Sequence, residues 1–208
     1  MTRDYAVARR RMVREQIESA GIADPRVLRA MQEVPRHLFV PRLLCHRAHQ
    51  PSALPIGYGQ TISKPFTVGL MTTLLELQGH EHVLEVGTGS GYQAAILARL
   101  ARSVITVERV RPLAAQSRIA LAKLGVENIN VYALDGTVGA PDHAPYDAIM
   151  VTACAPELPP LLVGQLKDGG RLLIPVKRGK EQILYRYRRQ GEQVLVEQSL
   201  SCRFVPLL

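Results

Sequence analysis

The sequence predicts an α/β fold: a doubly wound, mostly parallel sheet with helices on both faces. Three observations support this prediction. Short apolar strands alternate with helical segments between residues 66 and 176, as in parallel sheets whose strands are joined by helices. A cluster of glycines directly follows the first of these strands, as in Rossmann-like folds. After residue 176, two alternating segments flank Gly191, which predicts closing antiparallel strands.

An α-helical N-terminal extension is expected before the sheet. Residues 5–20 carry apolar residues at helical spacing among charges, which predicts a surface helix. A second helix should begin at Asp24-Pro25, because aspartate caps a first turn well and proline is favoured at the first helical position. Four prolines between residues 35 and 55 then interrupt the chain, so we expect a long irregular loop up to about residue 60.

The core of the predicted fold covers residues 66–176. Its expected strands are 82–86, 103–107, 129–134, 148–151 and 171–176. Its expected helices are 67–77, 92–100, 112–124 and 159–166, with a turn at Gly169-Gly170. The closing hairpin pairs 183–188 with 194–198. We therefore expect a single domain over residues 1–208: the helical extension and loop (1–65), the core (66–176), and the hairpin with its tail (177–208).

The composition is that of a soluble globular protein. Hydrophobic residues make up 47% of the 208 positions, enough for a packed core. No apolar run approaches the ~20 residues that span a bilayer, and no signal-peptide pattern opens the chain. We therefore expect a cytoplasmic protein with no membrane partner. Three distant cysteines, Cys45, Cys154 and Cys202, offer neither a disulfide framework nor a metal site, so we expect free thiols and no metal.

The formal net charge is +8, and much of it lies in two basic clusters, at residues 9–14 and 186–189. A positive charge of this size attracts nucleic acid, acidic proteins and anionic membranes without specificity. We interpret the two clusters as the solvated faces of a helix and a strand, and we expect no dedicated nucleic-acid partner. An RNA-binding protein or RNA methyltransferase stays open as an alternative.

Residues 84–91 (LEVGTGSG) carry the most chemical information. Gly87, Gly89 and Gly91 stand at alternate positions after a strand, so the backbone can approach a ligand closely. The pattern is G-x-G-x-G, unlike the G-x-G-x-x-G of dinucleotide sites, and no Gly-Lys-Ser/Thr of a P-loop follows. A pyrophosphate ligand is therefore disfavoured, and the pattern is typical of class I S-adenosylmethionine enzymes.

Three acidic residues sharpen this prediction. Glu85, just before the glycines, would repel phosphate but can help to anchor a methionine ammonium through water. Glu108 ends the second strand about 20 residues beyond the first glycine, where an acid accepts from both ribose hydroxyls. Asp135 ends the third strand, and its carboxylate can accept from an adenine amino group. Because open α/β sheets bind ligands at the carboxyl ends of their strands, these features together predict bound S-adenosylmethionine.

The acceptor of the methyl group is expected to need no base. Residues 151–157 lack the Asx-Pro-Pro-aromatic motif of many enzymes that methylate nucleic-acid amines. No histidine is convincingly placed as a base, and we expect surface or structural roles for all six. A carboxylate, with a pKa of ~4, is already ionised at neutral pH and can attack a sulfonium methyl directly. The enzyme then mainly has to align the reactants and exclude water.

Five segments resemble the protein-L-isoaspartate O-methyltransferases. Residues 55–65 (PIGYGQTISKP) are similar to the substrate loop of that family, and residues 84–93 (LEVGTGSGYQ) to its cofactor motif. Further similar segments are 144–149 (APYDAI), 166–172 (LKDGGRL) and 203–207 (RFVPL). Their order and spacing fit from about residue 11 to the C-terminus, and the substrate loop together with the tail is the most specific part.

This resemblance implies methyl transfer from S-adenosyl-L-methionine to the free α-carboxylate of L-isoaspartyl residues in damaged proteins, with S-adenosyl-L-homocysteine as the second product. The methyl ester then cyclises to a succinimide without the enzyme and reopens partly to normal aspartate. Acceptance of D-aspartyl residues stays open. The resemblance makes Ser63 the active-site residue, and we assign its hydroxyl to orientation and hydrogen bonding, since no covalent intermediate is required.

The predicted site has a substrate part and a cofactor part. Substrate binding is assigned to Ile56, Gln60, Thr61 and Val205, with the backbone of Ile56 and Val205 holding an extended peptide. Cofactor binding is assigned to the substrate loop, the glycine motif and two strand ends, namely Thr61, Ile62, Ser63, Glu85, Gly87, Thr88, Gly89, Gly91, Glu108, Arg109, Asp135 and Gly136.

Three positions depart from the family pattern. Lys64 directly follows the serine, Val68 stands where some eukaryotic relatives have histidine, and Leu134 where many relatives have glycine. They leave the assignment standing but affect the expected substrate preference. A carboxyl methyltransferase for one dedicated peptide would share every motif and stays open as an alternative. We expect a monomer whose partners are damaged proteins and peptides.

Overall fold

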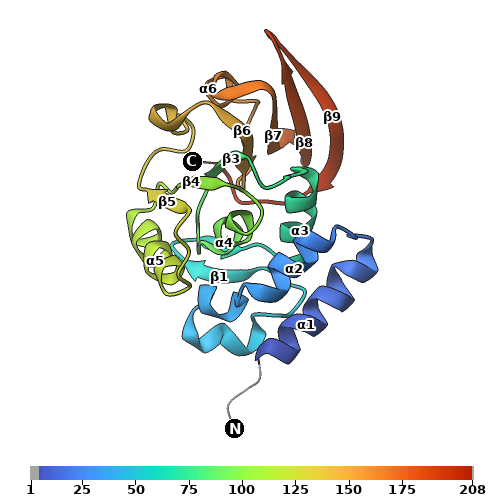
Figure 1. Cartoon of the computed structure of the whole chain (residues 1–208), viewed down its shortest axis with the longest axis vertical. Helices are drawn as coiled ribbons and strands as arrows, with labels where there is room; N and C mark the ends of the chain where they lie inside the picture. The colour runs from blue at the N-terminus through green and yellow to red at the C-terminus, as the bar shows by residue number, and fades with distance from the viewer. Residues whose placement is uncertain (1–4, 208) are drawn as a thin grey trace.

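The computed structural model describes residues 5–207, and a seven-stranded sheet forms its centre (Figure 1). The strands lie in the order β5-β4-β3-β6-β7-β8-β9. Five of them run parallel: β3 (His82–Val86), β4 (Ser103–Val107), β5 (Ile129–Tyr132), β6 (Tyr146–Val151) and β7 (Leu166–Arg178). Two antiparallel strands, β8 (Glu181–Gln190) and β9 (Gln193–Cys202), complete the sheet. The predicted mostly parallel sheet with closing antiparallel strands is confirmed.

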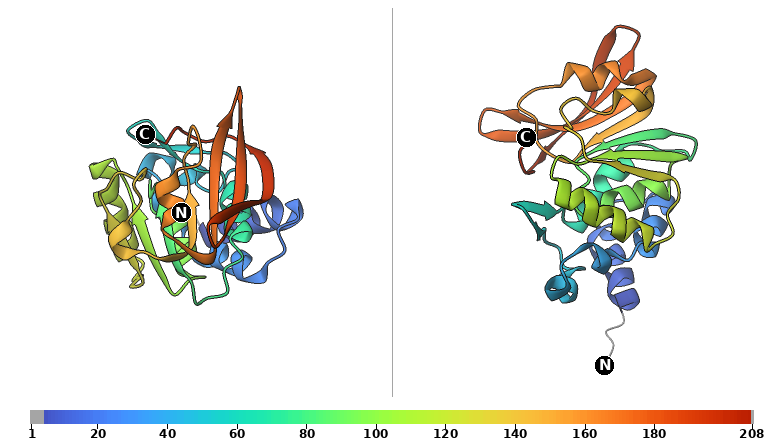
Figure 2. Two further views of the ribbon diagram at one scale, coloured as in Figure 1. Left: turned by 90° about the horizontal axis from the view of Figure 1, so that it is seen from above. Right: turned by 90° about the vertical axis from the view of Figure 1, so that its left-hand side faces the viewer.

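Successive residues of each strand point to opposite faces of the sheet, so the strands contribute side chains to two separate hydrophobic clusters, one on each face. Val83 and Val104 belong to the cluster that α3 (Pro65–Leu74), α4 (Tyr92–Ala98) and α5 (Arg111–Ala122) cover. Leu84 and Ile105 belong to the other cluster, under α6 (Pro160–Gly164) and the 3-10 turn η4 (Pro141–His143). The short α6 leaves the second face more thinly covered, as Figure 2 shows.

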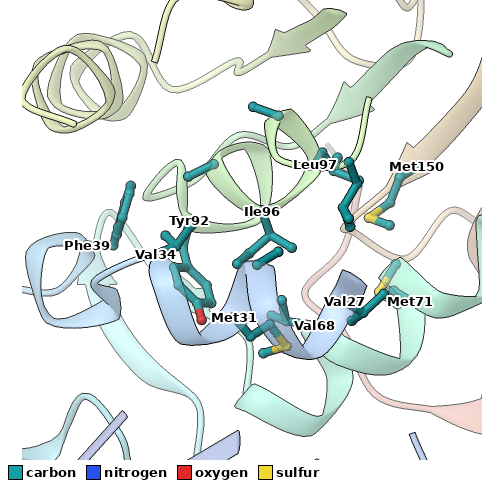
Figure 3. Packing of buried hydrophobic residues seen from close by; sticks show 14 of the residues in the cluster. Val27, Met31, Val34, Phe39, Val68, Met71, Tyr92, Ile96, Leu97 and Met150 are labelled. Atoms are coloured by element: carbon teal, nitrogen blue, oxygen red, sulfur yellow. The ribbon is translucent and has the colours of Figure 1, made fainter. Parts of the chain in front are cut away.

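The N-terminal extension packs against the helices that cover the first face. Its helices are α1 (Tyr5–Gln16) and α2 (Pro25–Glu33), with the 3-10 segment η1 (Glu18–Ala20) between them and η2 (Arg36–Phe39) and η3 (Arg42–Arg47) after them. The Asp24 carboxylate accepts from the Arg26 N–H at 2.9 Å, so the predicted cap of α2 is confirmed. Val27 and Met31 of α2 pack with Met71 of α3 and Ile96 of α4 in one buried layer (Figure 3).

The expected irregular loop up to about residue 60 is wrong in its last part. Residues of this segment form a small antiparallel hairpin, β1 (Leu54–Gly57) with β2 (Gln60–Ile62). Three consecutive residues at the turn have positive φ: Gly57 (94°), Tyr58 (54°) and Gly59 (70°). Two glycines make this left-handed turn accessible. A proline is tolerated in β1 because both strands of this two-stranded hairpin are edge strands.

The boundary between α6 and β7 also differs from the prediction. The helix ends at Gly164, two residues earlier than expected, and the Gly169-Gly170 pair lies within β7 rather than in a turn before it. The pairing of β6 with β7 shifts register at this point, and Gly169 has a φ of 74°. The glycines therefore form an irregularity inside a strand, which a pattern of turn residues does not distinguish from a turn.

Three further findings concern membrane-spanning helices, cysteines and metal-binding groups among the described residues. None of the helices between residues 5 and 207 is long and apolar enough to cross a membrane. The three cysteines are free thiols. Within the same residues, no group of three or more His, Cys, Asp or Glu side chains has the arrangement of a metal site, and the expected absence of a metal stays a prediction.

Candidate active site

Three adjoining cavities lie at the carboxyl ends of the parallel strands, where ligands of open α/β sheets bind. The outer cavity, of about 340 Å³, lies between the glycine loop, the end of β4 and the C-terminal tail. The inner cavity, of about 50 Å³, includes Ser63. The tail cleft, of about 450 Å³, lies between residues 61–67 and 201–205. Thr61 and Thr152 line all three cavities, so they stand where the three meet.

The glycine loop connects β3 to α4 and is fixed to the neighbouring strand. Gly87, Gly89 and Gly91 have φ values of 97°, 51° and 88°, in the left-handed region that favours glycine. The N–H groups of Gly87 and Thr88 donate to the Val107 carbonyl at 2.9 and 3.1 Å. A Cβ on Gly87 would lie 2.4 Å from the Thr152 hydroxyl oxygen, so the loop leaves no room for a side chain there.

Glu108 follows β4 and presents its carboxylate to the outer cavity. The residue is 7% exposed, and its two oxygens accept from the N–H groups of Gly89, at 2.8 Å, and Val110, at 2.9 Å. Each carboxylate oxygen keeps a further lone pair. Glu108 therefore braces the glycine loop and can still accept hydrogen bonds from a pair of ligand hydroxyls.

After β5, Gly136 lines the outer cavity, whereas Asp135 does not. Asp135 is exposed and accepts from the N–H of Thr137, at 2.9 Å, and from the Thr137 hydroxyl, at 2.7 Å. The hydroxyl and then the N–H of Thr137 hold the pKa of Asp135 below its usual value. Gly136, by contrast, lines the outer cavity. The structure thus brings the Gly136 backbone to the cavity, while the Asp135 carboxylate turns to its own loop.

Glu85 lies beneath the glycine loop and lines none of the three cavities. Its carboxyl accepts from the Thr106 hydroxyl at 2.5 Å, and the hydroxyls of Thr106 and Thr88 are 2.6 Å apart. The other oxygen of Glu85 has no hydrogen-bond partner. Burial raises the pKa of Glu85 to about 8, with the Thr106 hydroxyl acting in the opposite direction. Glu85 therefore reaches the inner cavity only through Thr106 and Thr88.

The hairpin and the tail supply the remaining predicted residues. Ser63 lines both the inner cavity and the tail cleft, and Val205 lines both the tail cleft and the outer cavity. The Val205 carbonyl accepts from the Cys154 N–H at 2.7 Å, which fixes the tail beside the end of β6. The other predicted residues that line a cavity are Gln60, Thr61, Ile62, Gly87, Thr88, Gly89, Glu108, Arg109 and Gly136.

Four predicted residues line none of the cavities: Ile56, Glu85, Gly91 and Asp135. Ile56 is buried in β1, with its side chain 3.4 Å from where a Cβ on Gly89 would lie. Gly91 caps the N-terminus of α4 with a φ of 88°. These two residues support the walls of the site, and their assigned contacts with ligands stay predictions.

Thr152 is a site residue that the sequence analysis missed. It directly follows β6, and its hydroxyl donates to the Gly87 carbonyl at 2.6 Å. The signal was available, because the rule that singled out Glu108 and Asp135 applies equally to the residue after the fourth parallel strand. A threonine carries no charge at that position, so a pattern of acidic residues at strand ends does not identify it.

Replacing Gly136 with alanine should weaken cofactor binding. The added Cβ would lie 2.5 Å from a methyl group of Val86, which is itself buried in β3, so the wall of the outer cavity has to shift. Overpacking of this kind costs about 1–3 kcal/mol. If this cost arises in the bound state, it corresponds to about a 5- to 150-fold increase in Kd. Calorimetric titration with S-adenosylhomocysteine would measure it, with Gly164→Ala, where a Cβ meets nothing, as the matched control.

Comparisons with known proteins agree with this geometry. The family model described as protein-L-isoaspartate(D-aspartate) O-methyltransferase matches residues 8–208. A Trichlorobacter lovleyi protein-L-isoaspartate O-methyltransferase is 52% identical over 99% of this chain and 95% of its own length. A Geotalea uraniireducens protein-L-isoaspartate O-methyltransferase 2 is 54% identical over 97% and 94%.

Solved structures support the same assignment of the fold. One protein-L-isoaspartate O-methyltransferase has a TM-score of 0.85 at 27% identity; the match covers 95% of this chain and 65% of that one. A Plasmodium falciparum structure described as a beta-aspartate methyltransferase, in complex with S-adenosyl-L-homocysteine, has a TM-score of 0.84 at 24% identity over 96% and 98% of the two chains. The full-length family match and the relatives above half identity show that this chain belongs to the protein-L-isoaspartate(D-aspartate) O-methyltransferase family.

Proposed function

We propose that this protein transfers a methyl group from S-adenosyl-L-methionine to the free α-carboxylate of L-isoaspartyl residues in damaged proteins, and so starts their repair. Membership of the family supports this activity. The observation that carries it in the structure is the place of Ser63. Ser63 lines both the inner cavity, beside the glycine loop, and the tail cleft, where we propose that the peptide binds.

The outer cavity fits the nucleoside of S-adenosylmethionine. The Glu108 carboxylate has acceptor capacity for both ribose hydroxyls, and the backbone at Gly87 and Gly136 lies where a Cβ would collide with neighbouring side chains. Close packing therefore requires glycine at these two positions, and both glycines line the outer cavity with backbone alone. When bound, S-adenosylmethionine supplies an electrophilic methyl group on a sulfonium.

The residues around the inner cavity suit a carboxylate acceptor. Among the described residues that line it there is no His, Asp, Glu, Lys or Cys, so no side chain there is a strong base. An ionised carboxylate needs none. The hydroxyls of Ser63 and Thr61 provide hydrogen bonds that orient the carboxylate, while Val68, Met71 and Tyr92 exclude water. The protein's contribution to the reaction is therefore alignment.

The tail cleft is the proposed binding site of the damaged peptide. It is walled by the segment after β2 on one side and by residues 201–205 on the other. Backbone groups of Ile56 and Val205 would hold the peptide, and Gln60 and Thr61 would shape the pocket. We further propose a monomeric, cytoplasmic enzyme that acts on many damaged proteins and needs no metal, and we leave D-aspartyl acceptance to experiment.

The test uses methyl-labelled S-adenosylmethionine and paired peptides that differ only in isoaspartyl against normal aspartyl at one position. We expect base-labile label on the isoaspartyl peptide alone. Ser63→Ala should lower kcat about 10- to 100-fold, the loss of one orienting hydrogen bond at the reacting centre. Ser52→Ala is the matched control, because Ser52 lines none of the three cavities, and kcat should stay within a factor of ~2.

Three other results would redirect the assignment. Label on neither peptide, despite tight S-adenosylmethionine binding, would contradict general repair and favour one dedicated peptide. Label on RNA, lost on mutation of the basic cluster at residues 9–14, would favour a nucleic-acid acceptor. Equal label on both peptides would show that the cleft does not distinguish the two linkages.

A further inference from the structure

Arg36 is a buried cation that the proposed chemistry does not use. It opens η2, it is 0% exposed, and it is the largest of the fully buried side chains. Arginine is almost never buried completely unless it is paired, because removing its charge from water costs several kcal/mol. Among residues 5–207, however, no carboxylate forms an ion pair with Arg36. Its partners are backbone carbonyls and an aromatic ring.

These partners come from three separate segments, and two of them, Ser63 and Tyr92, line the inner cavity. The Nε of Arg36 donates to the Ala48 carbonyl at 2.7 Å. Its Nη2 donates to the Ser63 carbonyl, also at 2.7 Å. Its Cζ lies 4.8 Å from the centre of the Tyr92 ring, a cation–π distance. Tyr92 is the first residue of α4, directly after the glycine loop.

Tyr92 also contacts a second residue of η2, Phe39. Its ring meets Phe39 edge-on at a centroid distance of 5.5 Å, and both pack in the buried layer with Val34 and Ile96 (Figure 3). A guanidinium is planar and rigid, so its donors stand at fixed angles to one another. The group therefore sets the Ser63 backbone at a fixed distance from the start of α4, and so from the glycine loop.

We propose that Arg36 is a positioning residue that holds the Ser63 hydroxyl in register with the cofactor. This inference rests on the role of Ser63 proposed above. A hydroxyl that orients a reacting carboxylate has to be placed within about 0.5 Å, and a misplacement of about 1 Å can cost ~100-fold in rate. The buried guanidinium joins the N-terminal extension, the substrate loop and the first turn of α4 at one point.

A double-mutant cycle separates this role from simple stabilisation. The variants are Arg36→Met, Ser63→Ala and the two combined, with kcat measured at saturating peptide and S-adenosylmethionine and at a temperature where each is folded. We expect Arg36→Met to lower kcat about 30-fold when Ser63 is present and less than about 3-fold in the S63A background. The dissociation constant of S-adenosylhomocysteine should change less than the kcat does.

Two further variants protect the test against misfolding. Arg36→Lys keeps the charge but cannot make both hydrogen bonds in the same geometry, so it should lower kcat about 5- to 10-fold with the same dependence on Ser63. Arg186→Met is the matched control. Arg186 is 8% exposed and pairs with Glu76 and Glu197 away from the three cavities, so its loss should lower the melting temperature without lowering kcat.

The outcomes distinguish a failure of the role proposed for Arg36 from a failure of the role proposed for Ser63. If Arg36→Met or Arg36→Lys lowers kcat by the same factor with and without the Ser63 hydroxyl, Arg36 does not act through Ser63 and the inference is wrong, while the proposed function stands. If kcat is unchanged in the Arg36 variants, the inference is likewise overturned. If Ser63→Ala alone leaves kcat unchanged, the role of Ser63 fails, and the inference fails with it.

Discussion

Glu108→Ala should weaken the binding of S-adenosylmethionine at least 100-fold. The variant removes the acceptor for the ribose hydroxyls and leaves the N–H groups of Gly89 and Val110 without their partner. A hydrogen bond to a charged group contributes about 1.5–3 kcal/mol, so the loss of two corresponds to a factor of 100 or more. Glu108→Gln should lose nearly as much, because one oxygen becomes an NH₂ group that faces an N–H donor.

The measurement is a calorimetric titration with S-adenosylhomocysteine, and Asp135→Asn is the informative comparison. Asp135 is exposed and its carboxylate serves Thr137, so we expect that variant to change Kd by no more than about fivefold. Equal losses at the two positions would mean that the loop after β5 rearranges on binding. A Glu108 variant with unchanged affinity would remove the outer cavity from consideration as the nucleoside site.

The sequence predicts the parallel part of this fold well because the signals there are local. Each buried strand is a short apolar run, and a helix pattern follows it, so β3, β4 and β6 fall within a few residues of the expected bounds. The hairpin of β1 and β2 was missed because its strands are very short and contain a proline. Its formation depends on a left-handed turn at Tyr58, which no apolar pattern signals.

The sequence predicts which residues stand at the ends of the strands, and so which residues lie near the cavities. It does not predict in which direction each of their side chains points. Glu108, Gly87 and Gly136 line the outer cavity as expected from their strand ends. Asp135 has the same position in the sequence pattern, but its carboxylate turns back to Thr137, and a sequence gives no information on that choice. Arg36 was not singled out at all, since a lone arginine among prolines looks like a surface residue until its burial is known.

Glu85→Gln should make the unliganded protein more stable at neutral pH, by up to about 3 kcal/mol. The wild-type carboxyl is fully buried, and burial raises its pKa from 4.5 to about 8. Below about pH 4.5 the carboxyl is protonated in the folded and the unfolded chain, so it has no effect on stability. Between 4.5 and 8 the unfolded chain releases the proton while the folded chain keeps it, so stability falls as the pH rises.

The difference in melting temperature between Glu85→Gln and the wild type isolates this effect, because every other titrating group is common to both. For a chain of this size, about 3 kcal/mol corresponds to about 6–12 °C. We expect a small difference at pH 4.5 that grows steadily up to about pH 8 and then levels off. Glu127→Gln, on the surface, should follow the wild type throughout. A difference in melting temperature that is constant from pH 4.5 to 8 would contradict this prediction. It would show that the glutamine acts through packing, and that the contacts of Glu85 with Thr106 and the loop above keep it ionised in the folded protein.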